Sequence, residues 1–226
     1  RKGIPGTFGS WIGLRRKTKI ALQLILSLFI GGLLYFKLGI NSLYVPILEL
    51  NLYMGPLYIL FSAFIIIYFT NAFNFTDGLD GLASGLFLIL LITYLVIALT
   101  VIDTPLLLFI SLLIGTVTAF LLFNIFPASI FLGDAGALSF GAVVAVLGLL
   151  MGNIFALLFI GGLFFAEALS SVIQIFWWKL FKKKFFPIAP IHHTFLAIGW
   201  QEPKIVMRAW IVGIILAIFG LWLATI

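Results

Sequence analysis

Seven long apolar segments divide this chain and constrain its fold more than any other feature of the sequence. A membrane-spanning helix needs about 20 mostly apolar residues, within a range of about 17–25. Segments of about this length lie at residues 20–36, 55–73, 82–102, 105–126, 136–152, 154–178 and 205–226. We therefore predict an all-α integral membrane protein of about seven transmembrane helices, with residues 1–226 forming a single transmembrane domain.

The composition agrees with a chain whose main solvent is lipid. Its residues are 64% hydrophobic and 9% charged, whereas soluble domains carry about 25% charged residues. The apolar runs are continuous rather than alternating, so strands are not expected. The fifth segment is short and rich in Gly and Ala, which predicts packing against protein. The sixth is long and carries Glu167, and we expect it to be kinked or to extend out of the bilayer.

Lysine and arginine are unevenly divided between the two sets of loops that seven spans create. One set of loops is poor in these residues and carries only Lys37, whereas the other set is rich in them. The rich set comprises residues 1–19, 71–81, 127–135 and 179–204. The positive-inside rule places the rich set in the cytoplasm and the C-terminus outside. The same set contains the main polar candidates, which are Asp77, Asp80, Asp134, His192 and His193.

The stretch "NAFNFTDGLDGLASG", residues 71–85, contains two acids between two apolar segments. In one interpretation Asp77 or Thr76 caps the following helix, and Asp80 lies in its first turn near the positive end of the helix dipole. In the other, the neighbouring glycines let a ligand approach the backbone. Free N–H groups at the helix start could then hold phosphate, and the carboxylates could hold a metal or a sugar hydroxyl. Both interpretations stay open for this stretch alone.

A third acid, Asp134, lies in "FNIFPASIFLGDAGALSFGA", residues 123–142, again between two spans. Taken alone, a helix cap is the better interpretation. Three carboxylates on one membrane face repel one another unless a cation joins them, however, so we predict a Mg²⁺ site. The chain has no cysteine, which excludes disulfides and thiolate metal sites.

The stretch "KKKFFPIAPIHHTFLAIGWQEPKI", residues 182–205, forms most of a predicted cytoplasmic histidine loop at 179–204. Two prolines precede His192 and His193, which could donate hydrogen bonds to phosphate or transfer protons. The three lysines are interpreted mainly as an anchor beside anionic lipid. In the sixth span, Glu167 is a functional candidate, whereas Gln174 could equally form a helix–helix hydrogen bond.

These stretches resemble the motifs of the phospho-N-acetylmuramoyl-pentapeptide transferase family, one of the polyprenyl-phosphate N-acetylhexosamine-1-phosphate transferases. The matching segments are "NAFNFTDGLDGLASG", "FLGDAGALSFGA" and "PIHHTFLAIGWQEPKIVMRAW". The resemblance implies Mg²⁺-dependent transfer of phospho-MurNAc-pentapeptide from UDP-MurNAc-pentapeptide to undecaprenyl phosphate, giving lipid I and UMP. It also implies a multi-pass protein of the bacterial inner membrane with a cytoplasmic active site.

The resemblance assigns roles to individual residues. Asp134 corresponds to the Mg²⁺ ligand, and Asp77 and Asp80 correspond to acids that shape the nucleotide and diphosphate site. His192 and His193 match a histidine motif near the sugar-phosphate.

It also implies a substrate-binding group. Asn71 and Asn74 would form hydrogen bonds, Phe131 would stack on uracil, and Gln174 would contact the same base. The family suggests a homodimer, and no nucleic acid is expected among the partners.

Two departures from the family pattern are visible. The family usually has three consecutive histidines, and Thr194 stands at the third position here. The family also has ten spans and an Asp-Asp pair at the end of the third, and this sequence has no Asp-Asp. Since "GLRRK", residues 13–17, resembles the segment before the fourth span, we expect an N-terminally incomplete member. Such a fragment alone would be inactive.

Two other functions remain open from the sequence. A UDP-GlcNAc polyprenyl-phosphate GlcNAc-1-phosphate transferase would share most of these residues, although the ending "APIHH" with "GWQEP" favours the muramoyl-pentapeptide branch. A membrane transporter without transferase activity would also carry intramembrane polar groups, but at mid-bilayer depth rather than at one face.

Overall fold

The prediction of an all-α membrane protein is confirmed by the structure, a computed structural model that describes residues 16–101 and 103–225. The predictions made for residues 1–15, including most of the loop at 1–19, lie outside this part of the chain. Seven of the described helices are long and apolar enough to cross a membrane. The helices are α1 (Arg16–Phe36), α2 (Leu57–Thr76), α3 (Leu82–Val101), α4 (Thr104–Asn124), α5 (Gly133–Leu150), α6 (Ile154–Ile160), α7 (Gly162–Phe181), α8 (Ile191–Ala197) and α9 (Glu202–Thr225).

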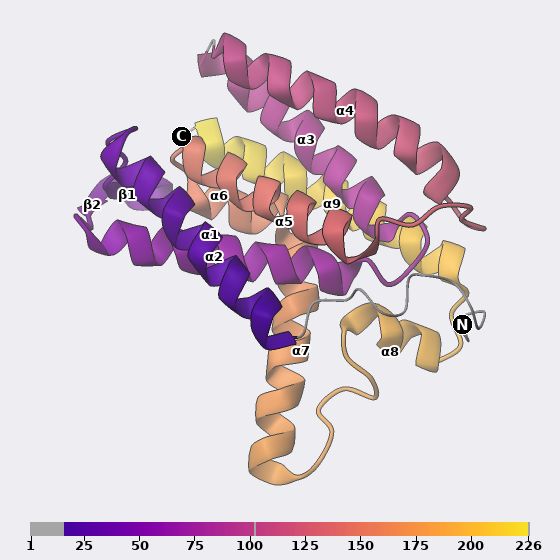
Figure 1. Ribbon diagram of the computed structural model, residues 1–226. Coiled ribbons are helices and arrows are strands. Elements are labelled where there is room, and N and C mark those ends of the chain that lie inside the picture. The colour runs from indigo at the N-terminus through magenta and orange to yellow at the C-terminus, as the bar shows by residue number, and fades with distance from the viewer. Residues whose placement is uncertain (1–15, 102, 226) are drawn as a thin grey trace.

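The sixth apolar segment is broken at Gly161, as the expected kink requires. The short α6 ends at Ile160, and α7 starts at Gly162 and leaves the bundle at a steep angle (Figure 1). A Cβ added at Gly161 would lie 3.0 Å from the Phe69 ring and 3.1 Å from the Leu157 carbonyl oxygen. The break therefore falls where only a residue without a side chain fits comfortably against α2.

A small hairpin in the connection from α1 to α2 corrects the expectation that strands are absent. Strands β1 (Ser42–Val45) and β2 (Leu50–Tyr53) pair antiparallel, with a single 3₁₀ turn at Pro46–Leu48 between them. The reversal is completed by Glu49, whose φ is 50°. The apolar-run argument excluded strands that cross the bilayer, but it did not apply to a short loop whose backbone groups can pair with each other.

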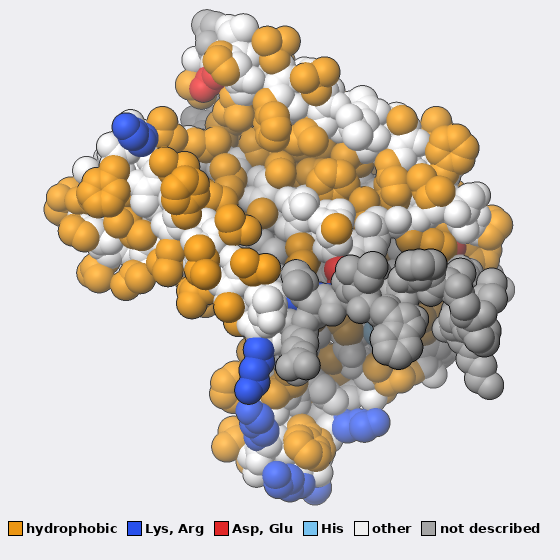
Figure 2. Space-filling model, viewed as in Figure 1, with side chains coloured by type: hydrophobic (Ala, Val, Ile, Leu, Met, Phe, Trp, Pro, Cys, Tyr) orange, Lys and Arg blue, Asp and Glu red, His pale blue; other side chains and the backbone are white. Residues whose placement is uncertain are grey.

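The bundle is built around α2, which packs against α1, α5 and α7, while α3 packs against α4 and α9. Aromatic rings fill the centre. Phe73 of α2 stacks on Phe164 of α7 with ring centroids 5.0 Å apart, and Phe87 of α3 meets Phe73 edge-on at 5.5 Å. Figure 2 shows hydrophobic side chains covering much of the outer face of the bundle, as expected for helices that face lipid.

The two ends of the bundle differ in character. The hairpin and the end of α9 lie at one end, while α8 and the starts of α1, α5 and α9 lie at the other (Figure 1). Beyond its buried first half, α7 projects from this second end, and lysine side chains gather at its tip (Figure 2). The polar segments thus share one end of the molecule. The assignment of that end to the cytoplasm stays a prediction.

Candidate active site

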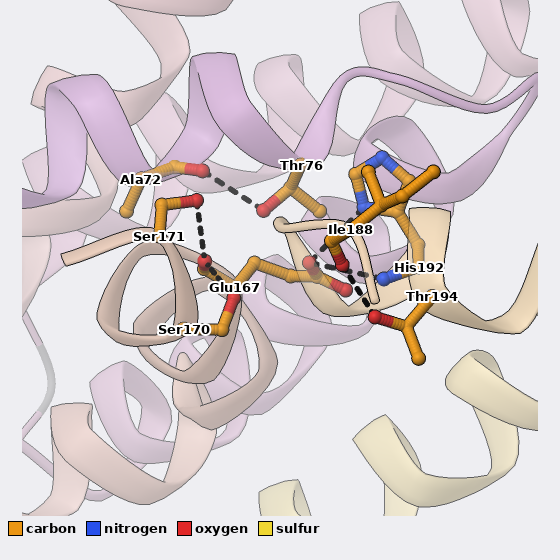
Figure 3. Close-up of polar contacts among 8 residues, drawn as sticks. All are labelled: Ala72, Thr76, Glu167, Ser170, Ser171, Ile188, His192 and Thr194. Atoms are coloured by element: carbon orange, nitrogen blue, oxygen red, sulfur yellow. Dashed lines mark hydrogen bonds and ion pairs between the residues drawn. The ribbon is translucent and has the colours of Figure 1, made fainter. Parts of the chain in front are cut away.

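The loop at residues 77–81 connects α2 to α3, and its position corrects the predicted helix cap. Thr76 is the last residue of α2, and its hydroxyl donates to the Ala72 carbonyl at 2.8 Å (Figure 3). Asp77 follows as the C-terminal cap of the same helix. Because α3 starts only at Leu82 and has no acid in its first turn, neither Asp77 nor Thr76 caps it.

The carboxyl of Asp77 is partly buried at this end of the bundle. Burial raises the pKa of Asp77 from its ordinary value of 3.8 to about 6. A ligand that brings a positive charge or a hydrogen-bond donor to this carboxyl would offset the cost of ionising it. Asp77 is therefore a suitable group for contacting a ligand.

Asp80 instead binds two distant parts of the chain. Its Oδ2 accepts a hydrogen bond from the backbone N–H of Ala128 at 2.9 Å. Its own backbone N–H donates to Glu202 Oε1, at the start of α9, at 2.7 Å. Asp80 thus fastens the loop at 77–81 both to the α4–α5 connection and to α9.

Asn124, at the end of α4, is a site residue that the sequence analysis did not identify. Its Oδ1 accepts from the Ser84 hydroxyl at 2.6 Å and from the Gly81 N–H at 3.3 Å. Its Nδ2 donates to the Ile130 carbonyl at 3.0 Å, and the Trp210 indole donates to the Gly81 carbonyl at 3.2 Å. The sequence signal for Asn124 was an amide side chain at the end of an otherwise apolar span. Such a buried polar group is normally hydrogen-bonded, which predicts partners for it nearby.

Asp134 lies in the first turn of α5, where the N-terminal residue before the helix, Leu132, provides no side-chain cap. Its carboxylate forms an ion pair with Lys19 of α1, and its side chain is 63% exposed. A cavity of about 290 Å³ opens beside this pair and is also lined by Asn71 and Asn74 of α2. The structure thus brings these two predicted substrate-binding asparagines next to the predicted metal ligand.

The three predicted carboxylates do not surround a common position. Within residues 16–101 and 103–225, no three His, Asp or Glu side chains are grouped closely enough to hold a metal ion. The reason is that Asp80 is held by Ala128, whereas Asp134 is paired with Lys19. The described structure thus does not bring Asp77, Asp80 and Asp134 around one position, and the Mg²⁺ site stays a prediction.

The residues around Asp134 nevertheless fit a magnesium ion. Mg²⁺ commonly binds through one or two carboxylates, several waters and substrate phosphates. Asp134 already attracts a cation, the Lys19 ammonium, and the Asn71 amide nitrogen is engaged by Gln23 and the Ile67 carbonyl. The Asn71 carbonyl oxygen is then the atom of that amide suited to a hard cation or its waters.

The connection at 179–204, which carries the two histidines, contains the short helix α8. Within α8, His192 is 1% exposed, and its Nδ1 lies 3.0 Å from Oε2 of Glu167 in α7 (Figure 3). The neighbouring His193 is less buried. Burial lowers the pKa of His193 below its usual range, and the nearby Glu167 partly offsets this. His193 thus tends to be neutral near pH 7.

The helix α8 also approaches the loop at 77–81. A Cβ added at Gly78 would lie 2.5 Å from Nε2 of His192, so only glycine leaves room for the imidazole there. At the third-histidine position, the hydroxyl of Thr194 donates to the Ile188 carbonyl (Figure 3). Thr194 therefore stabilises the backbone that leads into α8.

The remaining two predicted residues are Gln174 and Phe131. Among the residues that the structure describes, Gln174 has no hydrogen bond to another helix. Its amide binds the backbone that follows α7, accepting from the N–H groups of Phe185 and Phe186 at 3.1 and 2.8 Å. Phe131 is 55% exposed in the connection before α5. Their predicted contacts with uracil stay predictions.

Comparison with known proteins identifies the family of this chain. Residues 6–152 match the sequence model of glycosyl transferase family 4. The chain is 38% identical over 208 residues to the phospho-N-acetylmuramoyl-pentapeptide-transferase of Clostridioides difficile, covering 91% of this chain and 65% of that protein. It is 36% identical over 217 residues to that of Staphylococcus saprophyticus, covering 93% and 67%. It is 38% identical over 227 residues to that of Borrelia duttonii, and the match covers 92% of this chain and 65% of that protein.

This chain therefore spans about two thirds of the length of the curated relatives it matches. The match includes the loop at 77–81 and the start of α5, which the structure places at one end of the bundle. The chain belongs to glycosyl transferase family 4 and, within it, to the phospho-N-acetylmuramoyl-pentapeptide-transferase family.

Proposed function

We propose that this protein serves the Mg²⁺-dependent transfer of phospho-MurNAc-pentapeptide from UDP-MurNAc-pentapeptide to undecaprenyl phosphate, which gives lipid I and UMP. The observation that carries the proposal is the convergence of three polar segments, far apart in sequence, at one end of an apolar bundle. These segments are the loop at 77–81, the start of α5 and helix α8. The names of the relatives support the same reaction.

Both substrates are anionic, so the site must first overcome their repulsion. Transfer of a phosphoryl group is promoted mainly by positioning and by electrostatic stabilisation. Asp134, with Asn71 beside it, would hold a magnesium ion, which would supply positive charge for the diphosphate and for the departing UMP. Lys19 would contribute a second positive charge at the same place. Asp77 would contact the nucleotide-sugar from the loop at 77–81.

The lipid acceptor explains why this chemistry lies at the end of a membrane bundle. Undecaprenyl phosphate would keep its tail in the bilayer and present its phosphate at the surface. The polar groups lie where the spans end, and the surfaces between the ends are apolar. A transporter, by contrast, would place charged groups at mid-bilayer depth along a path.

We also propose that the 226-residue chain by itself lacks transferase activity. The family uses an Asp-Asp pair at the lipid phosphate, and the sequence contains no two adjacent aspartates. Without that pair, an acceptor phosphate would lack its acidic partners. Rapid UMP release by the chain alone would contradict this part of the proposal.

The direct test joins the N-terminal spans of the Clostridioides difficile relative to this chain and measures UMP release in detergent with undecaprenyl phosphate. We expect Mg²⁺-dependent release with UDP-MurNAc-pentapeptide and none with UDP-GlcNAc. The variant Asp134→Ala should abolish release, whereas Asp103→Asn, which alters an acid at the opposite end that caps α4, should retain it. Turnover by Asp134→Ala would refute the metal assignment, and turnover only with UDP-GlcNAc would refute the donor.

A further inference from the structure

Glu167 has a buried partner that the proposed function leaves unexplained. It lies in the first half of α7, with its side chain only 10% exposed. Its Oε2 is 3.0 Å from Nδ1 of His192 and 3.4 Å from the backbone nitrogen of the same residue (Figure 3). One carboxylate oxygen therefore meets both N–H positions at the start of α8.

The chemistry of these contacts determines where the imidazole carries its proton. An ionised carboxylate only accepts hydrogen bonds, so Nδ1 of His192 must be the protonated nitrogen. The other ring nitrogen, Nε2, is buried and has no hydrogen-bond partner in the described structure. A buried N–H without an acceptor is rarer and more costly than a buried lone pair without a donor. The contacts thus favour the form with the proton on Nδ1 and a lone pair on Nε2.

The orientation of that lone pair is also fixed. A Cβ added at Gly78 would lie 2.5 Å from Nε2 and 3.1 Å from Cε1, so this edge of the ring packs against the backbone of the loop at 77–81. The adjacent residue in the loop is Asp77, a candidate ligand contact. Nε2 therefore faces the loop at 77–81, and the proposed substrate would contact this loop through Asp77.

We propose that Glu167 is a positioning residue that keeps His192 in the Nδ1–H form and directs its Nε2 lone pair at the loop at 77–81. In this form Nε2 can accept a hydrogen bond but cannot donate one to a phosphate oxygen. Because Nε2 packs against Gly78, a hydroxyl or amide N–H of a bound sugar would reach it only when the loop at 77–81 shifts. The proposal deepens the proposed function and rests on it for the identity of the bound group. The proton position itself is independent of any reaction.

A purely structural role for Glu167, joining α8 to α7, must be distinguished from this one. Both roles would lower stability if the carboxylate were lost, so stability cannot decide. The position of the imidazole proton can distinguish the two roles, because a purely structural link between α7 and α8 does not require the proton to be on one particular ring nitrogen. The chain contains only two histidines, so His193→Gln leaves His192 as the single imidazole to observe.

The experiment records ¹⁵N spectra of histidine-labelled chain in lipid nanodiscs at neutral pH without substrate, in the His193→Gln background. We expect Nε2 to have the strongly downfield shift of a bare nitrogen and Nδ1 the shift of a protonated one. Glu167→Gln should retain this pattern, because the His192 backbone N–H keeps the amide oxygen, not the amide nitrogen, facing the ring. Glu167→Leu should shift the proton to Nε2, wholly or in part.

The control is Ser170→Ala, which removes a hydroxyl that donates to the Glu167 backbone carbonyl at 2.7 Å and leaves the carboxylate untouched. Its spectrum should match the wild type. A wild-type spectrum with the proton on Nε2, or an unchanged His192 spectrum in Glu167→Leu, would overturn the proposal. If Glu167→Leu does not fold, a proton on Nε2 in the wild-type or the Glu167→Gln spectrum would still overturn the proposal. Because no substrate is present, the absence of transferase activity would leave this result unaffected.

Discussion

Replacing Gly141 by alanine tests the packing that brings α5 to α2. A Cβ at this position would lie 2.5 Å from the Phe69 carbonyl oxygen and 2.6 Å from Cα of Thr70. Both atoms belong to the backbone of α2, so no side-chain rotation can relieve the contact. Since an ordinary contact begins near 3.4 Å, the two helices would have to separate by roughly 1 Å.

The expected cost follows from two opposing contributions. Overpacking a close-packed interior costs about 1–3 kcal/mol, whereas exchanging glycine for alanine inside a helix returns up to about 1 kcal/mol. We therefore expect Gly141→Ala to lower the free energy of unfolding by about 1–2 kcal/mol. For a chain of this size, that corresponds to a fall in Tm of roughly 2–8 °C.

Thermal unfolding in mild detergent, followed by the loss of the monodisperse peak on size exclusion, measures this effect. The matched control is Gly115→Ala, because Gly115 lies inside α4 with no atom within 4 Å of an added Cβ. Gly115→Ala should leave Tm unchanged or raise it. Equal Tm values for the two variants would show that α5 does not approach the α2 backbone as described, and the positioning of Asp134 beside Asn74 would lose its basis.

Three further predictions concern the polar end of the bundle. Because burial raises the pKa of Asp77 to about 6, ionising it costs folded stability, so Asp77→Asn should be more stable than the wild type above pH 6. Its advantage in thermal stability should shrink as the pH falls towards 3.8, and a pH-independent difference would contradict the assignment. Asn124→Ala removes the acceptor for Gly81 N–H and the Ser84 hydroxyl, and each unsatisfied group costs about 1–3 kcal/mol, so Tm should fall clearly. Gln174→Leu removes the acceptor for the Phe186 N–H and should release the backbone after α7, so trypsin should cleave faster at the lysines of that backbone. An unchanged cleavage rate would contradict a stabilising role of the hydrogen bond between Gln174 and Phe186.

Much of the fold could be predicted because lipid leaves a spanning segment few alternatives. Every backbone polar group in the bilayer must be satisfied within its own helix or a closed barrel, so continuous apolar runs of sufficient length predict helices. All seven predicted spans have a counterpart in the structure. Their ends were less certain, and α5 starts at Gly133 rather than at 136 because Gly133 adopts a φ of 62° that allows the chain to turn into the helix earlier.

The hairpin at 42–53 and the helix at 191–197 were not predicted. Both are short, lie outside the spans, and have no apolar run long enough to reveal them. The hydrogen-bond partners of the acidic residues also could not be predicted from the sequence. Local rules allowed Asp77 or Thr76 as an N-terminal cap. Instead, Asn124 and Glu202 hold the loop at 77–81 in place from distant helices, and the chain turns before α3 starts.

The sequence by itself determined the number of spans, the residues that carry the family motifs, and their gathering at one end of the bundle. Each of these depends on local composition and on the alternation of direction from one span to the next. Only the tertiary structure decided which polar groups meet. The pairing of Asp134 with Lys19 joins residues 115 positions apart, and that of His192 with Glu167 joins residues 25 apart. Such pairs depend on helix packing, which the local pattern of a sequence does not specify.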